Sequence, residues 1–378
     1  MNNLIKELKN NLDFYFSEVL GKPIVKPHWI YVSLSHKCTF RCQMCGVVNI
    51  LNGYELKQGE VEKVIDDIAG WNNNSVMVIT GGEPFLNKNI FDIIKYGVVR
   101  NLKIEIVSNG SLIDNELAEK IVASGLQNIA ISLDGANEET HDYIREKGAF
   151  KKALNAIKLL TEIKKTKGMG PQISVWTTIM KENVRELYDI IPLVKDFGVE
   201  CLVYHPVVVA QDDMQNTSPN APFWIKGDDL VILKDEIGKI VKYEKEHGLV
   251  VFLHNPYMWV EHFKGSLTKK DWKCNPFVFI NIGPDAEVRS CGTAFGNVKD
   301  IGLNACLSTR EADKARKIMQ QCQKPCLQTC WAHPESDSLK SIIEDFIHKT
   351  NEVQDKTLIL EEGLRLLARY KKMVEENV

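Results

Sequence analysis

Six short apolar segments alternate with helical patterns over the first 205 residues, and this alternation most restricts the folds that the chain can adopt. The segments span residues 30–35, 76–80, 102–107, 128–133, 173–179 and 201–204. Strands that alternate with helices pair in parallel through right-handed crossovers, which predicts a sheet buried beneath its helices. A closed eight-unit barrel takes about 250 residues, and six units that end near His205 are too few to close one. We therefore predict an α/β fold built on a partial, open (β/α)6 barrel.

The rest of the chain shows fewer strands and more helices. Apolar residues spaced three and four apart predict a helix over residues 2–19, and the tail from Ser338 onward is also helical in pattern. Residues 211–227 are rich in Pro, Asn and Asp and predict a long loop. We divide the chain into an N-terminal helix at 1–29, the barrel at 30–210, a linker and helix at 211–260, a small cysteine-rich domain at 261–335, and C-terminal helices at 336–378.

Composition narrows the class of protein. The formal net charge is -3 over 378 residues, which argues against a broad nucleic-acid surface. The N-terminus lacks the continuous apolar core of a secretory signal, and no stretch approaches the roughly 18 apolar residues of a membrane span. We therefore expect a cytoplasmic protein without a membrane span. Its ten cysteines then indicate metal or redox chemistry, because structural disulfides are rare in that compartment.

The first cysteine cluster is the segment KCTFRCQMCG, which follows the first predicted strand. It holds Cys38, Cys42 and Cys45 where α/β folds present functional loops, at the carboxyl end of a strand. Three thiolates can bind three irons of a [4Fe-4S] cluster and leave the fourth iron free for another ligand. A structural zinc site, or three cysteines that lie close together by chance, is the alternative.

In this loop the chain resembles the radical S-adenosylmethionine superfamily, whose hallmark is C-x3-C-x2-C after the first strand of a partial barrel. Cys38, Cys42 and Cys45 match that spacing. The resemblance implies that they bind a [4Fe-4S] cluster whose open iron binds S-adenosylmethionine. Met44 stands where the family usually has an aromatic residue near the adenine, and its polarizable thioether can fill the same contact.

The sequence GGEP follows the second predicted strand, as Gly81, Gly82, Glu83 and Pro84. Two glycines let the backbone approach a ligand closely, and a carboxylate accepts hydrogen bonds from an ammonium group. The family's GGEP motif binds the methionine amino group of the co-substrate in this way. Taken alone, the motif could equally be a plain strand-to-helix turn.

Polar residues also follow the third and fourth strands: Ser108, Asn109, Ser132 and Asp134. The resemblance implies that they bind the ribose hydroxyls and the methionine carboxylate, although capping and turn residues look alike. Arg145 ends a segment that resembles the HDxxR motif of the superfamily branch with an extra cluster domain. There it would neutralise the methionine carboxylate, a group that a planar guanidinium can bind at two points. A solvated or ion-paired arginine is the alternative.

A second cysteine set lies late in the chain and comprises Cys274, Cys291, Cys322, Cys326 and Cys330. Two cysteines at the mouth of a predicted hairpin and two from a later loop can hold an auxiliary [4Fe-4S] cluster or a structural zinc ion. The set resembles the twitch domain, a shortened SPASM domain with one auxiliary cluster. Ala286 replaces the family's usual glycine, and the late C-x3-C-x3-C run leaves the ligands among the last three cysteines open. Cys201 and Cys306 are expected to be core residues.

The resemblance implies an enzyme that reductively cleaves S-adenosylmethionine to a 5'-deoxyadenosyl radical, which then removes hydrogen from a substrate. Such an enzyme requires an electron donor such as flavodoxin or ferredoxin, and an auxiliary cluster could make the net reaction an oxidation. Only about 29 residues precede the first strand, which favours a small substrate, such as a sugar, nucleotide or lipid-linked metabolite, over a peptide or protein. A non-catalytic iron-sulfur or zinc redox sensor is the alternative from another class. No catalytic acid, base or hydrogen donor can be assigned from the sequence.

Overall fold

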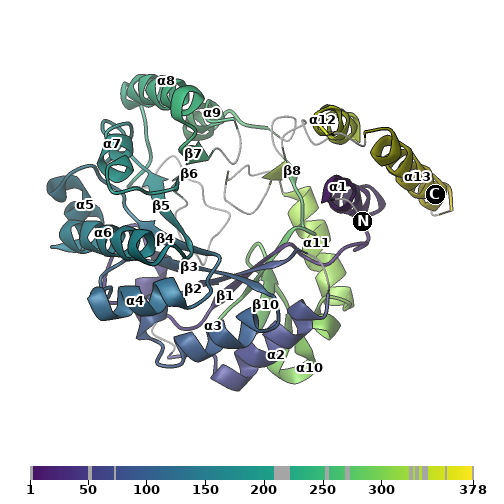
Figure 1. Cartoon of the computed structure of the whole chain (residues 1–378), viewed down its shortest axis with the longest axis horizontal. Coiled ribbons are helices and arrows are strands. Elements are labelled where there is room, and N and C mark those ends of the chain that lie inside the picture. Colours follow the sequence, from purple (N-terminus) through teal and green to yellow (C-terminus); the bar gives the residue numbers. More distant parts are fainter. Residues whose placement is uncertain are drawn as a thin grey trace.

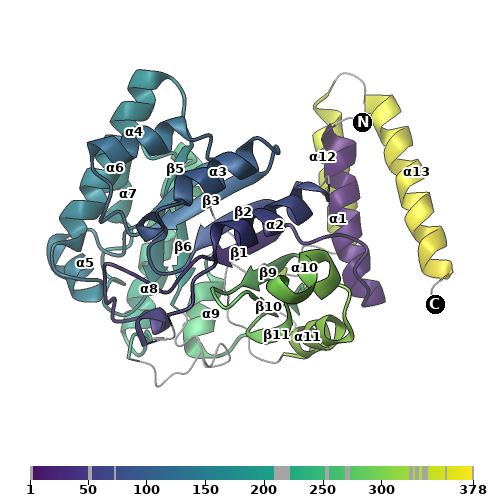
Figure 2. The ribbon, with the colours of Figure 1, turned by 90° about the horizontal axis from the view of Figure 1, so that it is seen from below.

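The computed structural model describes residues 3–49, 53–71, 74–207, 222–251, 255–268, 273–322, 327, 332–333, 339–353 and 356–376. Two parts are visible in Figures 1 and 2: a curved sheet covered by helices, and a group of three helices at its side. The predicted long loop falls mostly on residues 208–221, which lie outside the described ranges.

Six parallel strands form the centre of the sheet, as the alternating pattern predicted. They are β1 (Trp29–Ser33), β2 (Val76–Thr80), β3 (Lys103–Ser108), β4 (Asn128–Ser132), β5 (Gln172–Ile179) and β6 (Cys201–Pro206). The helices between them are α2 (Gln58–Ala69), α3 (Ile90–Val98), α4 (Asn115–Ala123), α5 (Glu138–Ile144), α6 (Ala149–Lys167) and α7 (Ile190–Lys195). They lie on the outer, convex side of the sheet (Figure 1). The predicted α/β fold with a partial barrel is confirmed.

The sheet is wider than six strands. After α8 (Asp229–His247), the short strand β7 (Val250–Val251) pairs in parallel with β6. At the other edge, β9 (Phe279–Ile282) pairs in parallel with β1, and β10 (Glu287–Ser290) and β11 (Thr293–Asn297) follow in antiparallel order. The sequence predicted the β9–β10 hairpin, but not that its first strand extends the barrel sheet beside β1.

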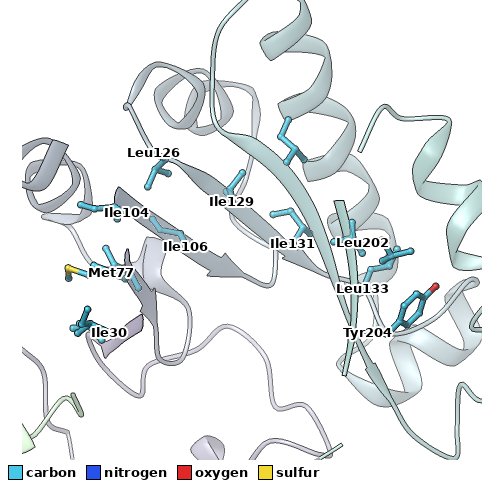
Figure 3. Packing of buried hydrophobic residues seen from close by; sticks show 14 of the residues in the cluster. Ile30, Met77, Ile104, Ile106, Leu126, Ile129, Ile131, Leu133, Leu202 and Tyr204 are labelled. Atoms are coloured by element: carbon cyan, nitrogen blue, oxygen red, sulfur yellow. The ribbon is translucent and has the colours of Figure 1, made fainter. Parts of the chain in front are cut away.

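Successive side chains of each strand lie on opposite faces of the sheet. On the outer face, Ile30, Met77, Ile104 and Ile129 are fully buried against the helices (Figure 3). Because side chains of a strand point alternately to opposite faces, the residues between them face the inside of the barrel. Trp29, Tyr31 and Ser33 of β1 belong to this inner face and are only partly buried.

A C-terminal module packs against the barrel through the hairpin and two helices, α10 (Val298–Cys306) and α11 (Arg310–Gln321). Besides the pairing of β9 with β1, Asp67 of α2 links this module to the barrel: it accepts hydrogen bonds from the backbone N–H of Leu303 at 2.9 Å and the side chain of Asn304 at 2.6 Å. Gly302 breaks the helical geometry of α10 just before these donors, with φ +74°. The remaining short elements are α9 (Met258–Lys264), β8 (Lys273–Cys274) and β12 (Ala332–His333), and the last two pair in antiparallel order.

The two chain ends form one helical bundle. The N-terminal helix α1 (Asn3–Leu20) packs against α12 (Leu339–Asn351) and α13 (Lys356–Glu375), apart from the barrel helices (Figure 2). Its buried core consists of Ile5, Leu8, Leu12, Phe16, Phe346, Ile359 and Tyr370. The sequence predicted these helices but left open whether the tail covers the barrel, and it packs instead on the N-terminal helix.

Within the described residues, no helix combines the length and the apolar character that crossing a membrane requires.

Candidate active site

The loop that follows β1 brings the three cysteines of the first cluster to the carboxyl edge of the sheet. Cys42 is buried, whereas Cys38 and Cys45 are half-buried. Burial raises the pKa of the Cys42 thiol to about 11, nearby Arg145 lowers it, and Cys45 raises it further. The three thiols therefore lie within electrostatic reach of one another and of a cation, as ligands of one anionic cluster should.

The loop is held by the two glycines of GGEP. A Cβ on Gly82 would lie 1.9 Å from the carbonyl oxygen of Lys37, and one on Gly81 would lie 2.4 Å from that of Ser35. Gly82 and Glu83 donate backbone hydrogen bonds to these same oxygens, at 2.9 and 2.8 Å. The sequence predicted that the glycines let the backbone approach the co-substrate; the structure gives them a second role, which is to let β2 close against the cysteine loop.

Glu83 is a buried carboxylate that joins the carboxyl ends of β2 and β3. Its Oε1 accepts hydrogen bonds from the Ser108 hydroxyl at 2.9 Å and from the backbone N–H of Phe85, and its Oε2 accepts one from the backbone N–H of Asn109 at 2.9 Å. Burial raises its pKa, and these bonds oppose the rise. A carboxylate has about four acceptor positions, so three bonds leave capacity for an ammonium group. Pro84 begins the short turn that follows, Pro84–Leu86.

Asn109 connects this network to the cysteines. Its side-chain amide donates to the Thr39 hydroxyl at 3.1 Å and approaches the Cys38 sulfur at 3.6 Å. Hydrogen bonds to cluster sulfurs are one means by which proteins tune iron-sulfur sites. Three thiols on one loop, a nearby cation and an amide directed at sulfur together fit the donor set of a [4Fe-4S] cluster.

Asp134 follows β4 and is fully buried. It forms an ion pair with Nε of Arg145 at 2.6 Å and accepts a hydrogen bond from the backbone N–H of Thr178 at 2.8 Å. The terminal nitrogens Nη1 and Nη2 of Arg145 form no hydrogen bond with the described residues. Arg145 can therefore pair with Asp134 and still offer two donors to a carboxylate. The co-substrate contact predicted for Asp134 stays a prediction.

The residues around this ion pair are mostly structural. His141 is buried, accepts a hydrogen bond from the backbone N–H of Asp134, and has its pKa lowered by burial to about 4. Asp142 caps the start of α6 through Gly148 and Phe150. These bonds join side chains to backbone N–H groups six to eight residues away, in the turns before α5 and α6.

Asn183, which follows β5, also contacts these residues: its side-chain amide donates to the carbonyls of Asp134 and Thr178, both at 2.8 Å. Two residues predicted to contact the co-substrate, Ser132 and Met44, lie nearby. Ser132 is buried at the end of β4, opposite Trp176. Met44 is half-buried and packs against the apolar group formed by Phe40, Cys42 and Ala149. The contacts predicted for these residues with the co-substrate stay predictions.

The second cysteine set is described only in part. Cys274 on β8 and Cys291 after β10 both pack against the small apolar cluster formed by Phe279 and Met319. Cys322 ends α11, while Cys326 and Cys330 lie outside the described residues. Among the residues that are described, no three Cys, His, Asp or Glu side chains gather closely enough to bind a single metal ion.

Ala286 and the two isolated cysteines, Cys201 and Cys306, were also singled out in the sequence. Ala286 adopts φ +68°, a left-handed conformation that glycine adopts without strain, which explains why the family usually has glycine there. Cys201 and Cys306 are buried, as predicted for core residues.

Comparison with known proteins places this geometry in a family. Residues 32–194 match the radical SAM superfamily. AdoMet-dependent heme synthase of Methanosarcina barkeri is 32% identical over 182 residues, which are 47% of this chain and 50% of that protein. Mycofactocin maturase MftC of Mycolicibacterium smegmatis is 30% identical over 166 residues, 44% of this chain and 41% of that protein. These matches span half or less of each relative's length.

Solved structures share the fold. Native anSMEcpe with bound AdoMet superimposes with a TM-score of 0.61 at 14% identity, covering 89% of this chain and all of that chain. SuiB of Streptococcus suis bound to S-adenosylmethionine gives 0.58 at 13% identity, covering 78% of this chain and 67% of that chain. Such low identities show the fold alone. The family match itself identifies residues 32–194 of this chain as a radical SAM domain.

Proposed function

We propose that the chain reductively cleaves S-adenosylmethionine at a [4Fe-4S] cluster bound by Cys38, Cys42 and Cys45, and uses the resulting radical on a small-molecule substrate. Enzymes of this superfamily use that cluster and S-adenosylmethionine. One observation carries the proposal: the cysteine loop, the GGEP turn and Asn109 are hydrogen-bonded into a single unit at the carboxyl edge of the sheet.

The bound cluster would supply one electron to break a carbon–sulfur bond of the co-substrate, and the chain's own residues would position the reactants. Glu83 would accept hydrogen bonds from the methionine ammonium group with its remaining acceptor capacity. Arg145 would bind the methionine carboxylate through the two nitrogens that Asp134 leaves available.

Sequence relatives support a small-molecule substrate. Proteins similar to this chain include heme synthases, an Fe-coproporphyrin III synthase and a GTP 3',8-cyclase. Inside the barrel, the half-buried side chains of Tyr31 and Trp176 lie on the inner face of the sheet, and aromatic surface suits flat ring systems. A peptide substrate is the second candidate, because subtilosin biosynthesis protein AlbA of Bacillus subtilis is 29% identical over 174 residues.

The C-terminal module supports an auxiliary cluster. Cys274 and Cys291 lie against the same apolar residues, and we propose that they bind an auxiliary [4Fe-4S] cluster together with two of Cys322, Cys326 and Cys330. Such a cluster could accept an electron from the substrate radical and make the net reaction an oxidation.

Cleavage of S-adenosylmethionine is tested in the absence of oxygen. The protein is reconstituted with iron and sulfide, reduced with dithionite, and assayed for 5'-deoxyadenosine beside a Cys38→Ala, Cys42→Ala, Cys45→Ala variant. We expect product from the native chain only. No product from a fully reconstituted native sample would overturn the proposal and favour a redox sensor.

The substrate class is tested in the same assay. Iron tetrapyrroles and nucleotides form one arm, and a peptide library forms the other. A small molecule is expected to raise 5'-deoxyadenosine formation several-fold above the uncoupled rate, and stimulation by peptides alone would reverse the assignment.

A further inference from the structure

A cavity of about 140 Å³ lies where the C-terminal module meets the linker between α1 and β1. Residues 23–27 of the linker form one wall, and the hairpin, α11 and the turn between α10 and α11 form the others. The lining includes Ile280, which pairs with Ile30 on the outer face of the sheet. The cavity therefore lies on the outer side of the sheet. None of its described lining residues belongs to the candidate active site or to either cysteine set.

Most of the cavity wall is apolar, and the cavity can be reached from solvent because the exposed Pro23 and Ser308 lie at its rim. An apolar cavity of about 150 Å³ accommodates a benzene molecule. This cavity therefore suits a compact apolar group, such as one aromatic ring or a short branched chain. The apolar side chains of the wall, apart from prolines, are Ile24, Val25, Phe277, Ile280, Phe295 and Leu307.

Arg316 places a buried cation on this wall, with 7% of its side chain exposed. Its Nη1 donates a hydrogen bond to Asp313 at 2.7 Å, and its Nη2 donates one to the carbonyl of Leu307. A guanidinium group carries five N–H donors, so these two bonds, the ones it forms within the described part of the chain, leave three donors for a ligand. Its Cζ lies 5.6 Å from the centroid of the Phe277 ring. The charged group and the aromatic wall therefore adjoin.

Lys26 brings a second cation to the same cavity. Its ammonium group donates a hydrogen bond to the side chain of Asn304 at 3.1 Å. Burial lowers the pKa of Lys26, Asp67 raises it, and Arg316 lowers it, so the two cations lie close enough to repel each other. Asp67 and Asp313 offset part of this charge from outside the cavity, whose described lining residues include no acidic side chain. An anion inside the cavity would relieve the repulsion directly.

We propose that this cavity binds a small carboxylate with a compact apolar body. The carboxylate contacts Arg316 and Lys26, because a planar guanidinium can bind a carboxylate at two points and an ammonium group adds a third donor. The apolar body packs against Phe277 and Phe295. Since the walls come from the linker and from the C-terminal module, the bound ligand stabilises the junction between them.

Isothermal titration calorimetry on the full, reconstituted chain tests binding with two carboxylates, benzoate and 3-methylbutanoate. We expect at least one of them to bind saturably at one site per chain. Benzyl alcohol has a similar apolar body without the charge, and it should bind about tenfold or more weakly because charge-assisted hydrogen bonds are lost. Inorganic phosphate lacks the apolar body and should also bind more weakly. No saturable binding of either carboxylate, or equal binding of benzyl alcohol or phosphate, would overturn the proposal.

Substitutions in the linker locate the site. Lys26→Met should weaken carboxylate binding by about fivefold or more, whereas Lys26→Arg keeps the charge and should retain most of it. Lys22→Met is the matched control, since it makes the same change in the same linker at a residue that does not line the cavity. Native binding in Lys26→Met would overturn the assignment. If Lys26→Met unfolds at a lower temperature than Lys22→Met, Ser308→Phe decides instead, because it keeps both cations and should block the rim.

Hydrogen exchange provides a readout at the site itself. The bound carboxylate should slow exchange at residues 24–26 and 307–316, which form two walls of the cavity. Slowing confined to the cysteine loop would overturn the assignment. The inference does not depend on the proposed function, so binding should persist in the Cys38→Ala, Cys42→Ala, Cys45→Ala variant. Loss of binding in that variant would place the ligand at the cysteine loop and contradict a separate site.

Discussion

Gly82 is the residue at which the second strand and the cysteine loop approach each other most closely. A Cβ at this position would lie 1.9 Å from the backbone oxygen of Lys37, and the next nearest atoms also belong to backbone. Because no flexible side chain can move aside, any larger residue must displace the loop that carries Cys38.

We predict that Gly82→Ala lowers the iron content of reconstituted protein well below that of the native chain. It should also destabilise the fold by about 1–3 kcal/mol, the usual cost of an overpacked site. Gly59→Ala is the control, because Gly59 lies in α2 with no atom near its missing Cβ. That change should stabilise the protein by about 0.5–1 kcal/mol and leave iron unchanged. Native iron content in Gly82→Ala would show that the close approach is unimportant for the cluster.

Asp134 and Arg145 form a buried ion pair with each other. Removing one partner of a buried ion pair leaves an uncompensated charge, which typically costs about 3–5 kcal/mol. We therefore predict that Asp134→Asn lowers the free energy of unfolding in urea by about 3 kcal/mol. Asp134→Asn combined with Arg145→Met should recover much of this loss, because no buried charge then remains. Additive losses in the double variant would contradict the pairing as the source of the effect.

At the scale of elements, the C-terminal module depends on a side chain of the barrel. Asp67 of α2 accepts hydrogen bonds from the start of the second half of α10, where Gly302 has interrupted the helix. A carboxylate at an interrupted helix satisfies backbone donors that would otherwise lack partners.

We predict that Asp67→Ala destabilises the module by about 1–3 kcal/mol and speeds hydrogen exchange over residues 298–306 more than elsewhere. The neighbouring Asp66→Ala is the control, since Asp66 is exposed and its side chain bonds, within the described part of the chain, only to Tyr96 and Arg100 of the barrel. Exposed ion pairs contribute little, so exchange over 298–306 should stay native in that variant. Equal exchange in both variants would show that Asp67 does not hold the module.

At the scale of the whole molecule, local patterns were readable from the sequence and long-range pairings were not. The six parallel strands and the cysteine loop follow from periodicity and spacing within short segments. The pairing of β9 with β1 joins residues far apart in the chain, and no local pattern encodes which edge a strand will join. The same holds for α1, whose apolar face was evident but whose partners, α12 and α13, come from the other end of the chain.

The candidate site, too, was predictable from the sequence only where its residues are close together in the chain. The sequence identified Cys38, Cys42 and Cys45 as a set because ligands on one loop have a fixed spacing. It could not show that Gly82 packs on Lys37 or that Arg145 pairs with Asp134, since both depend on how separate strand ends meet.

The cysteine loop is proposed to bind a [4Fe-4S] cluster with one iron open to S-adenosylmethionine. Electron paramagnetic resonance of the anaerobically reduced protein, recorded before and after addition of S-adenosylmethionine, tests this most directly. A Cys274→Ala, Cys291→Ala variant isolates the signal of the first cluster. We predict a [4Fe-4S] signal whose line shape changes when the co-substrate is added, and which is lost on Cys38→Ala. A signal that does not respond to S-adenosylmethionine, or that survives loss of Cys38, would show that the cysteine loop does not bind such a cluster.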